Sequence, residues 1–250
     1  MLRGFYLAAN GMYTEQRILD TIANNMANVN TVGYKSDTAV DTTFGEAMVL
    51  INGRQSDGYV EYRSVDVTET DLSQGSFDET GSNLDIAIDG ELYFNIQVQR
   101  GDNEILLTKA GAFSIDDEGY LALGDSGRVC DDNGQPIQIN ASDFTVGTKG
   151  LITTADGREF QLGLTYIEDA SDVEKVRDNL FRPYNGEALG NIPDGLPYRV
   201  RQGFIERSNA SLAELQIAAQ SHQGVFTACA TAIKIMTQLN SLATQDYTIT

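Results

Sequence analysis

The sequence predicts a mainly β body, built of antiparallel strands and hairpins, with a long α-helix at each end of the chain. Apolar residues recur at steps of three and four within residues 1–30 and again within residues 211–243. The region between them is rich in Gly and Asp and alternates apolar and polar residues. Nearly all of the net charge of −19 also lies between the two stripes. Two nearly uncharged apolar stripes need a partner, so we expect the terminal helices to pair as a coiled coil.

The first helix is expected over residues 5–26. Gln16 interrupts its apolar stripe. The Asn-rich residues 24–30, followed by Gly33, are expected to end the helix, because Asn and Gly tolerate the left-handed conformation found at helix ends. The stripe consists of Leu2, Phe5, Ala9, Met12, Leu19, Ala23 and Met26.

The periodicity of apolar residues changes twice in the middle of the chain. Residues 35–58 show weak periodicity and are expected to be linker-like. From residue 59 the period becomes two, and turn signals such as Asp-Gly separate the apolar segments, so residues 59–207 are predicted to form an antiparallel β domain. Residues 182–198 hold three of the four prolines and are expected to form a loop. The expected strands are residues 59–67, 84–90, 92–98, 105–107, 112–115, 120–123, 136–139, 151–154 and 161–167.

The second helix is expected over residues 212–243. Ser211 and Glu214 have the spacing of a capping box at its start. The helix would be roughly 50 Å long, which is longer than a core of this size needs, and this favours a bundle with other subunits. Residues 1–34 and 208–250 are therefore predicted to form one terminal assembly domain. The second stripe consists of Leu212, Leu215, Ala219, Phe226, Cys229, Ile233 and Met236.

Composition narrows the classes of function. Lys and Arg total 17 against 36 Asp and Glu, so the surface is expected to repel nucleic-acid backbones. Apolar residues do not run continuously for the ~18–20 positions that a bilayer span needs, and we expect neither membrane insertion nor a cleavable signal. Cys130 and Cys229 leave one disulfide open as an alternative, but free thiols are favoured, because Cys229 lies on an apolar stripe.

Four features resemble reactive sites, and each has a simpler interpretation. Residues 124–127 read Gly-Asp-Ser-Gly, like a protease nucleophile loop, but the chain has one histidine, His222, so a turn is favoured. The acidic residues 116–118 and 131–133 lack the spacing of a calcium loop and are typical of hairpin turns. Asp85 and Asp89 could serve a hydrolase, but both are expected to face water. We therefore predict no catalytic, cofactor or metal site, and no enzyme.

Four stretches, in chain order, resemble the flagellar rod and hook protein family. Residues 24–35 read Asn-Asn-Met-Ala-Asn-Val-Asn-Thr-Val-Gly-Tyr-Lys, like the end of the family's first helix and the turn that follows. Val32 stands where the family usually has Pro. The other three stretches are residues 84–94, residues 108–121 and residues 203–209.

The resemblance implies a structural subunit of the bacterial flagellar basal-body rod. Its terminal helices would stack helically with other copies and with other rod and hook proteins, and the flagellar type III export apparatus would deliver it to the basal body. The short segment after Lys35 suits a proximal rod protein better than a distal one. The alternative is a secreted β-rich binding or adhesin module that its terminal helices oligomerise; a defined small oligomer that binds glycan or calcium would identify it.

Within this interpretation the assembly residues come from both helices and from the Asn-rich stretch. Asn24, Asn25 and Asn28 fit two roles, a helix-end cap and hydrogen bonding between helices or subunits, and we keep both. The predicted assembly residues are Leu2, Phe5, Met12, Leu19, Asn24, Asn25, Met26, Asn28, Leu212, Leu215, Phe226, Ile233 and Met236.

Overall fold

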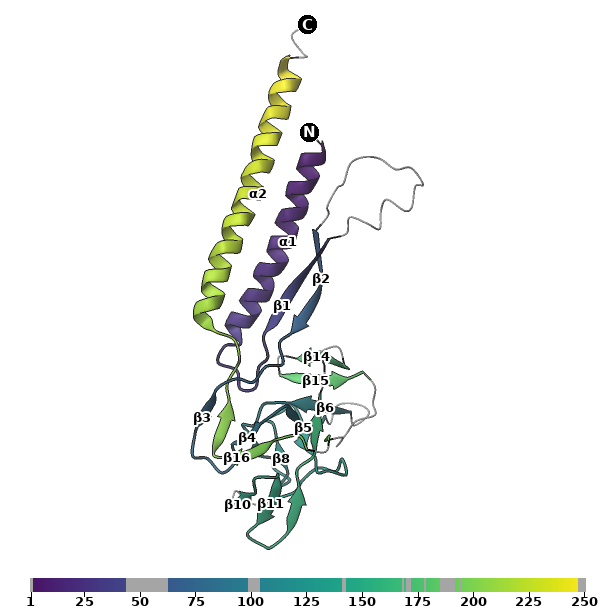
Figure 1. Cartoon of the computed structure of the whole chain (residues 1–250), viewed down its shortest axis with the longest axis vertical. Coiled ribbons are helices and arrows are strands. Elements are labelled where there is room, and N and C mark those ends of the chain that lie inside the picture. Colours follow the sequence, from purple (N-terminus) through teal and green to yellow (C-terminus); the bar gives the residue numbers. More distant parts are fainter. Residues whose placement is uncertain are drawn as a thin grey trace. The chain divides into compact units, whose positions relative to one another are not determined.

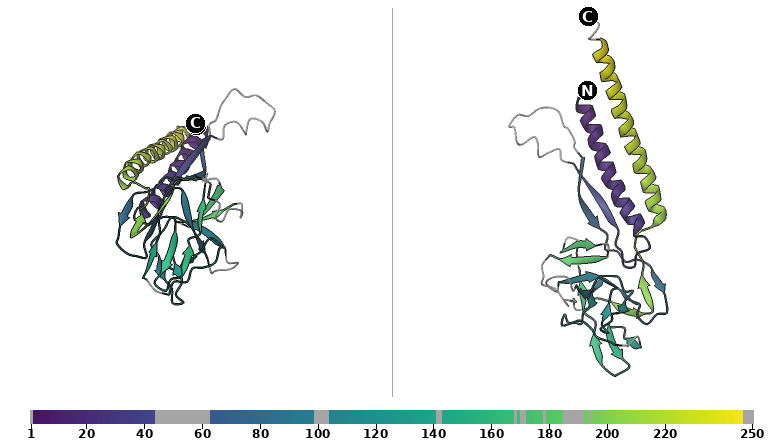
Figure 2. Two further views of the ribbon diagram at one scale, coloured as in Figure 1. Left: turned by 60° about the horizontal axis from the view of Figure 1, so that its bottom comes forward. Right: turned by 180° about the vertical axis from the view of Figure 1, so that it is seen from behind.

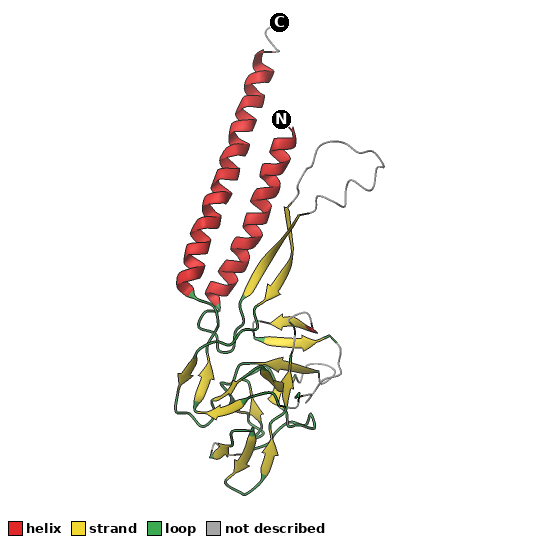
Figure 3. Ribbon diagram, viewed as in Figure 1, coloured by secondary structure: helices red, strands yellow, loops and turns green. Residues whose placement is uncertain are grey.

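The computed structural model describes residues 2–43, 63–98, 104–140, 143–167, 169, 172–177, 179–184, 192–193 and 195–246. It confirms the predicted fold class, with one helix near each end of the chain and antiparallel strands between them (Figures 1 and 3). The chain divides into two compact units. Unit 1 contains residues 1–27, 37–69 and 211–250, and unit 2 contains residues 28–36 and 70–210.

Unit 1 is built on two long helices, α1 (Leu2–Ala27) and α2 (Leu212–Asp246). They lie side by side and antiparallel, as two views from opposite sides show (Figures 1 and 2). Close contacts fix their register, because a Cβ atom placed on Gly4 would lie 3.2 Å from Met236, and one on Gly11 would lie 3.2 Å from Cys229. At ~1.5 Å per residue, the last turns of α2 therefore extend past the first residue of α1.

A two-stranded sheet completes unit 1. Strand β1 (Asp37–Thr43) pairs with β2 (Arg63–Thr70), and β1 also packs on α1. We expected residues 37–43 to be linker-like. Their Thr and Val side chains favour extended backbone, which a strand partner and a helix surface then stabilise. The rest of the expected linker, residues 44–58, lies outside the described residues.

Unit 2 holds the remaining strands. The largest sheet has the order β14-β15-β6-β5-β9-β8-β7, with β13 paired to β5, and smaller sheets are β10-β11-β12, β16-β4 and β17-β3. The bounds are β3 (Phe77–Glu79), β4 (Ile86–Asp89), β5 (Leu92–Gln97), β6 (Ile105–Thr108), β7 (Ser114–Ile115), β8 (Leu121–Ala122), β9 (Arg128–Val129), β10 (Phe144–Val146), β11 (Leu151–Thr154), β12 (Glu159–Gln161), β13 (Leu164–Tyr166), β14 (Val173–Arg177), β15 (Leu180–Pro183), β16 (Arg199–Gln202) and β17 (Phe204–Glu206).

Two expected strands differ from the structure. Residues 136–139 make only isolated bridges, through Pro136 and Gln138. Residues 161–167 are divided between β12 and β13, because Gly163 packs so closely on the Asp131 carbonyl that a Cβ atom there would lie 2.3 Å from the oxygen. The chain leaves one sheet at that point and joins another.

The core of unit 2 centres on β5. This strand has β6, β9 and β13 as neighbours and is buried on both faces. Leu92, Phe94 and Ile96 belong to the main apolar cluster, and Tyr93 belongs to a second cluster with Phe181. A strand buried on both faces has a nearly continuous apolar sequence instead of an alternating one, and β5 reads Leu-Tyr-Phe-Asn-Ile-Gln.

Candidate functional site

The contact between α1 and α2 includes one polar pair. His222 Nδ1 lies 2.7 Å from Glu15 Oε2, and Glu15 is 6% exposed. Gln16, next in the chain, is exposed and donates to Asp20 at 3.0 Å along the outside of α1. The two polar interruptions of the apolar stripes are thus different. His222 has a partner across the helix pair, whereas Gln16 lies on the outer surface of α1.

The predicted apolar assembly residues lie along the helix pair but are not sealed within it. Phe5 and Leu212 are exposed, and the side chain of Leu2 is outside the described part. The others with a described side chain are half-buried: Met12, Leu19, Met26, Leu215, Phe226, Ile233 and Met236. One helix partner therefore covers only part of each stripe.

The helices also expose apolar side chains beyond the predicted assembly residues. Among the described residues, thirteen large apolar side chains are exposed, and ten of them are on α1 or α2. Ile217 is 69% exposed and Leu242 is 59% exposed. Extended apolar surface of this kind marks an interaction site. We call these ten residues the exposed helix surface: Phe5, Tyr6, Leu7, Tyr13, Leu212, Ile217, Val225, Ile235, Leu239 and Leu242.

The predicted asparagines have separate places. Asn25 is 3% exposed; its Nδ2 donates to the Asp37 carbonyl at 2.7 Å, and its Oδ1 accepts from the Asp37 amide at 3.0 Å. Asn28 Oδ1 accepts from the Thr31 hydroxyl at 3.0 Å in the turn after α1. Asn24 is exposed. Asn25 and Asn28 thus hold backbone and turn within the subunit, and a role between subunits stays a prediction for all three asparagines.

Unit 2 contains a buried ion cluster of Lys35, Lys109 and Glu206. Lys35 Nζ lies 2.7 Å from Glu206 Oε1, and Lys109 Nζ lies 3.7 Å from Glu206 Oε2. Lys35 also donates to the Ser73 carbonyl at 2.6 Å, and Glu206 Oε1 accepts from the Gly75 amide at 3.0 Å. The cluster is almost fully enclosed, since the Lys35 and Glu206 side chains are 0% exposed.

Three of the four family-like stretches supply this cluster. Lys35 ends the first, Lys109 lies in the third, and Glu206 lies in the last. Backbone contacts join the same stretches: the Gly33 amide donates to the Glu206 carbonyl at 2.8 Å. The remaining stretch lies close by, where the Gly203 amide donates to the Asp85 carbonyl at 2.7 Å. Sequence reasoning identified the stretches but missed the ion cluster. Lys35 is the one charged residue of the first stretch, but the third and last stretches carry other charged residues as well, so no local pattern marked the cluster.

Burial shifts the proton equilibria around the cluster. It lowers the pKa of Lys109 to about 8, although the Glu206 carboxylate opposes that change; Lys35 makes a smaller contribution in the same direction as burial. Burial also raises the pKa of the Tyr93 hydroxyl well above its usual range, and Glu206 adds to that effect. Lys109 thus carries a charge that its surroundings only partly stabilise.

A second asparagine holds backbone in unit 2. Asn209 Oδ1 accepts from the Ser36 amide at 2.8 Å, and its Nδ2 donates to the Asp71 carbonyl at 2.8 Å. Asn209 belongs to the last family-like stretch, and sequence reasoning gave it no role. The side-chain amide acts like a piece of neighbouring strand, in the same way that Asn25 does in unit 1.

The features that resembled reactive sites have structural explanations. Residues 124–127 form the turn between β8 and β9, with the Ser126 amide donating to the Leu123 carbonyl at 2.9 Å. Asp116 Oδ1 accepts from the Glu118 and Tyr120 amides, which closes its own turn.

The carboxylates of the hydrolase hypothesis have different partners. Asp85 accepts from Thr80 at 2.6 Å, and Asp89 pairs with Arg201 at 2.5 Å. Within the described ranges, His, Cys, Asp and Glu nowhere gather in a group of three that could hold a metal ion. None of the helical segments that the structure describes is long and apolar enough to cross a membrane.

Comparison with known proteins adds two family matches. Residues 5–35 match the model described as flagella basal body rod protein. Residues 87–174 match the model described as flagellar hook protein FlgE/F/G D1 domain.

Curated relatives match over most of their length. The flagellar basal-body rod protein FlgG of Bacillus subtilis (strain 168) is 31% identical, over 97% of this chain and 99% of the relative. The flagellar basal-body rod protein FlgF of Caulobacter vibrioides is 30% identical, over 88% of this chain and 91% of the relative. The flagellar hook-basal body complex protein FlhP of Bacillus subtilis is 27% identical, over 86% of this chain and 88% of the relative.

Proposed function

The chain belongs to the flagellar basal-body rod protein family, and from that premise we propose that it assembles into the rod through its two terminal helices. It is a structural subunit of the bacterial flagellar basal-body rod, and the basal body is its location. The adhesin alternative has no support among the relatives. Relatives of nearly equal identity carry the names FlgG and FlgF, so a proximal position in the rod stays a prediction.

The exposed helix surface is the observation that carries the proposal. Its ten residues would remain in water if the helix pair had no further partner. Burying a large apolar side chain contributes ~1.5–3 kcal/mol relative to full exposure, so half-exposed residues would each gain roughly 1 kcal/mol in a packed assembly. Other copies of this chain and other rod and hook proteins supply the matching helices, as the family role requires.

The proposed division of labour follows the predicted domains. Residues 1–34 and 208–250 form the assembly domain, residues 35–58 connect, and residues 59–207 form the outer domain. Strand β1 lies within the connecting segment and packs on α1, so this segment also supports the assembly helices.

Two finer points belong to the same proposal. The flagellar export apparatus is a transient partner that delivers the chain, and the chain catalyses no reaction. The engaged carboxylates of Asp85 and Asp89 support the second point, since each already has a partner of its own.

The proposal is tested by placing charge on the exposed helix surface. Leu239→Asp should abolish assembly, because burying an unpaired carboxylate at a helix interface is strongly unfavourable. Two controls should assemble normally. Gln238→Asp introduces the same residue at the adjacent, exposed position of α2, and Leu151→Asp introduces it at the exposed first residue of β11 in unit 2.

Motility and electron microscopy of basal bodies provide the measurement, in cells whose own copy of the gene is replaced by each variant. Rods truncated at one defined level in the Leu239→Asp cells are expected, and that level also gives the position of the subunit. Normal rods and motility in cells carrying Leu239→Asp together with a second charge, Ile235→Asp, would contradict the proposal.

A further inference from the structure

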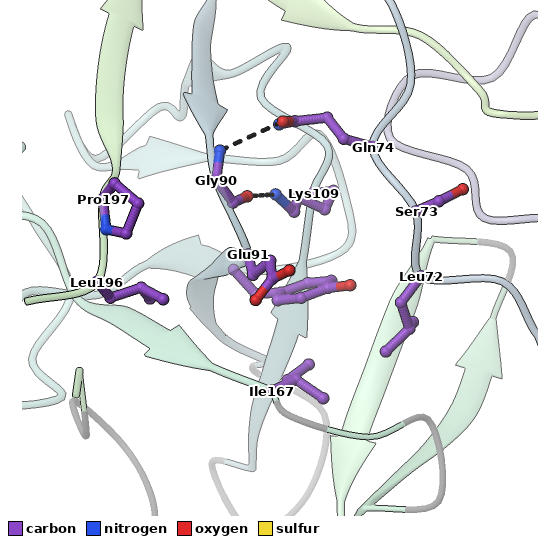
Figure 4. A pocket seen from close by; sticks show the side chains of 10 residues that line it. Leu72, Ser73, Gln74, Gly90, Glu91, Lys109, Ile167, Leu196 and Pro197 are labelled. Carbon is purple, nitrogen blue, oxygen red and sulfur yellow. Dashed lines mark hydrogen bonds between the residues drawn. The ribbon is translucent and has the colours of Figure 1, made fainter.

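Unit 2 contains a cavity of about 550 Å³ beside the ion cluster (Figure 4). Leu72, Ile167 and Leu196 give it apolar walls, and Glu91 lies at its exposed rim. Lys109 and Tyr93 also line it but are only 2% and 1% exposed, so they form its floor. The cavity therefore combines these apolar walls with polar lining from Ser73 and Gln74 and with two buried polar groups at its base.

The Tyr93 hydroxyl is an unused hydrogen-bond donor. It is buried and has no hydrogen-bond partner among the described residues. A buried polar group without a partner destabilises the fold, and most buried polar groups in proteins are hydrogen-bonded. An acceptor inside the cavity would remove that penalty.

The positive charge at the floor is also incompletely balanced. Lys35 and Lys109 share the single buried carboxylate of Glu206, and Lys109 is the more distant of the two, at 3.7 Å. The ammonium group of Lys109 makes one short hydrogen bond, to the Gly90 carbonyl at 2.5 Å. Glu91 also attracts it, but Glu91 is exposed and solvent screens its charge. An anion in the cavity would complete the charge balance.

We propose that this cavity binds a carboxylate on a short aliphatic chain, with the Lys109 ammonium and the Tyr93 hydroxyl donating to the carboxylate oxygens. The apolar walls cover the aliphatic part. Two sources have this chemistry: a free small carboxylic acid, and an acidic side chain of a neighbouring subunit. The second source is abundant, because each copy of this chain carries 36 Asp and Glu residues.

The electrostatics set the pH dependence of binding. The charged groups around the site are Lys109, Lys35, Glu206, Glu91 and Asp71, and the Tyr93 hydroxyl among them is neutral. Because the pKa of Lys109 is about 8, the ammonium group is lost as the pH rises above that value. Carboxylate binding should therefore weaken above pH 8, and binding should take up protons there.

The first test is an NMR titration of the full chain with butyrate. Saturable shifts are expected at the amides of Gly90, Tyr93 and Ala110. The neutral isostere butyramide should bind about tenfold more weakly, because a charge-assisted hydrogen bond is roughly twice as strong as a neutral one.

Tyr93→Phe separates binding from folding. It removes only a hydroxyl that lacks a partner, so the midpoint of urea unfolding should stay the same or rise. Butyrate affinity should nevertheless fall about fivefold or more, which corresponds to the loss of one hydrogen bond. Tyr184→Phe is the matched control, since Tyr184 is exposed and lies outside the cavity, and its affinity should not change.

Sedimentation of the concentrated full chain distinguishes the two sources. If a neighbouring subunit supplies the carboxylate, Tyr93→Phe should weaken self-association and butyrate should compete with it. If the ligand is a free acid, butyrate should bind the monomer and leave self-association unchanged. The proposal is overturned by two results together. Butyrate gives no saturable shift even at concentrations well above the millimolar range, and Tyr93→Phe self-associates like the wild type.

Discussion

Asn25 and Asn209 show how single side chains hold the backbone where the chain passes from one unit to the other. Asn25 makes two hydrogen bonds with the backbone of Asp37, which is the first residue of unit 1 after the unit 2 segment 28–36. Asn209 binds Ser36 and Asp71, on either side of the β1–β2 segment. Each amide makes the hydrogen bonds that a neighbouring strand would make, so a side chain satisfies these backbone groups.

The pair of Glu15 and His222 is expected to be coupled. Removing either partner alone leaves a polar group at the helix contact without its hydrogen bond, at a cost of about 1–3 kcal/mol. Glu15→Leu combined with His222→Leu should recover most of that loss, because an apolar pair of similar volume suits the half-buried stripe. Urea unfolding of the full chain, followed by the helical circular dichroism signal, measures the cycle.

An additive cycle, with the double variant as unstable as the sum of the two single variants, would show that the two side chains do not interact. Gln16→Leu is the matched control in α1. Its partner Asp20 is exposed, so the free energy of unfolding should change by less than about 0.5 kcal/mol.

Lys109 is expected to make stability depend on pH. Its folded pKa of about 8 lies below the ordinary value of 10.5, so between these values the unfolded chain binds more protons. The contribution of Lys109 to the free energy of unfolding therefore increases with pH above 8, by at most about 1.4 kcal/mol per pH unit. Burial raises the pKa of Cys130 to about 11 from 9.0, which lowers stability above pH 9, so the clearest interval is pH 8–9.

Comparison with Lys109→Met isolates this contribution. The difference in free energy of unfolding between wild type and variant should increase from pH 8 to pH 9, in urea titrations at matched ionic strength. A difference that does not increase over this interval would mean that folded Lys109 keeps its proton, and that burial does not lower its pKa. Cys130→Ala should not alter the increase.

At the scale of single residues, the sequence identified the family-like stretches but not the contacts between them. Lys35 and Glu206 lie inside stretches that were singled out, yet 171 positions separate them. No local pattern reports a pairing over that distance. The same holds for Glu15 and His222. His222 is a polar residue within the second apolar stripe, but nothing in the sequence indicates that its partner is Glu15.

Among the elements, the helices were the most predictable. The expected bounds of residues 5–26 and 212–243 differ from α1 and α2 by three residues at most at each end. Long periodic patterns and an end signal such as Gly33 are local properties of the sequence. Strand β1 was missed because its residues form a strand only with β2 and α1 beside them.

The turn after α1 leaves no room for a side chain at Gly33. Gly33 has a φ of 67°, and a Cβ atom there would lie 2.3 Å from the Ala110 backbone nitrogen. Gly33→Ala should therefore destabilise unit 2 by more than 3 kcal/mol, since it adds a backbone clash to the ~1–2 kcal/mol of left-handed strain. Gly157→Ala is a matched control, with a φ of 77° and no atom within 4 Å of the added Cβ.

Urea unfolding of both glycine variants provides the comparison. Gly157→Ala should show only the strain, about 1–2 kcal/mol. Equal losses for the two variants would mean that the contact with Ala110 contributes nothing.

At the scale of the whole molecule, unit 2 should fold without the terminal helices. The segment of residues 28–36 is part of its core, with Tyr34 and Lys35 both 0% exposed. A chain of residues 28–210 should therefore unfold cooperatively in urea and resist proteases in unit 2. A chain that begins at residue 37 should lose that resistance, because it leaves the Glu206 carboxylate buried without Lys35. Equal resistance of the two truncated chains would contradict this.

The separation of Lys35 and Glu206 in the sequence also affects the order of folding, if the chain is delivered with its N-terminus first. Closing a loop of 171 residues is entropically slow, and the cluster cannot form before residue 206 has arrived. A chain threaded from its N-terminus thus keeps Lys35 hydrated through most of its passage. The final closure of unit 2 would then coincide with the arrival of α2, so unit 2 and the second terminal helix would form at nearly the same moment.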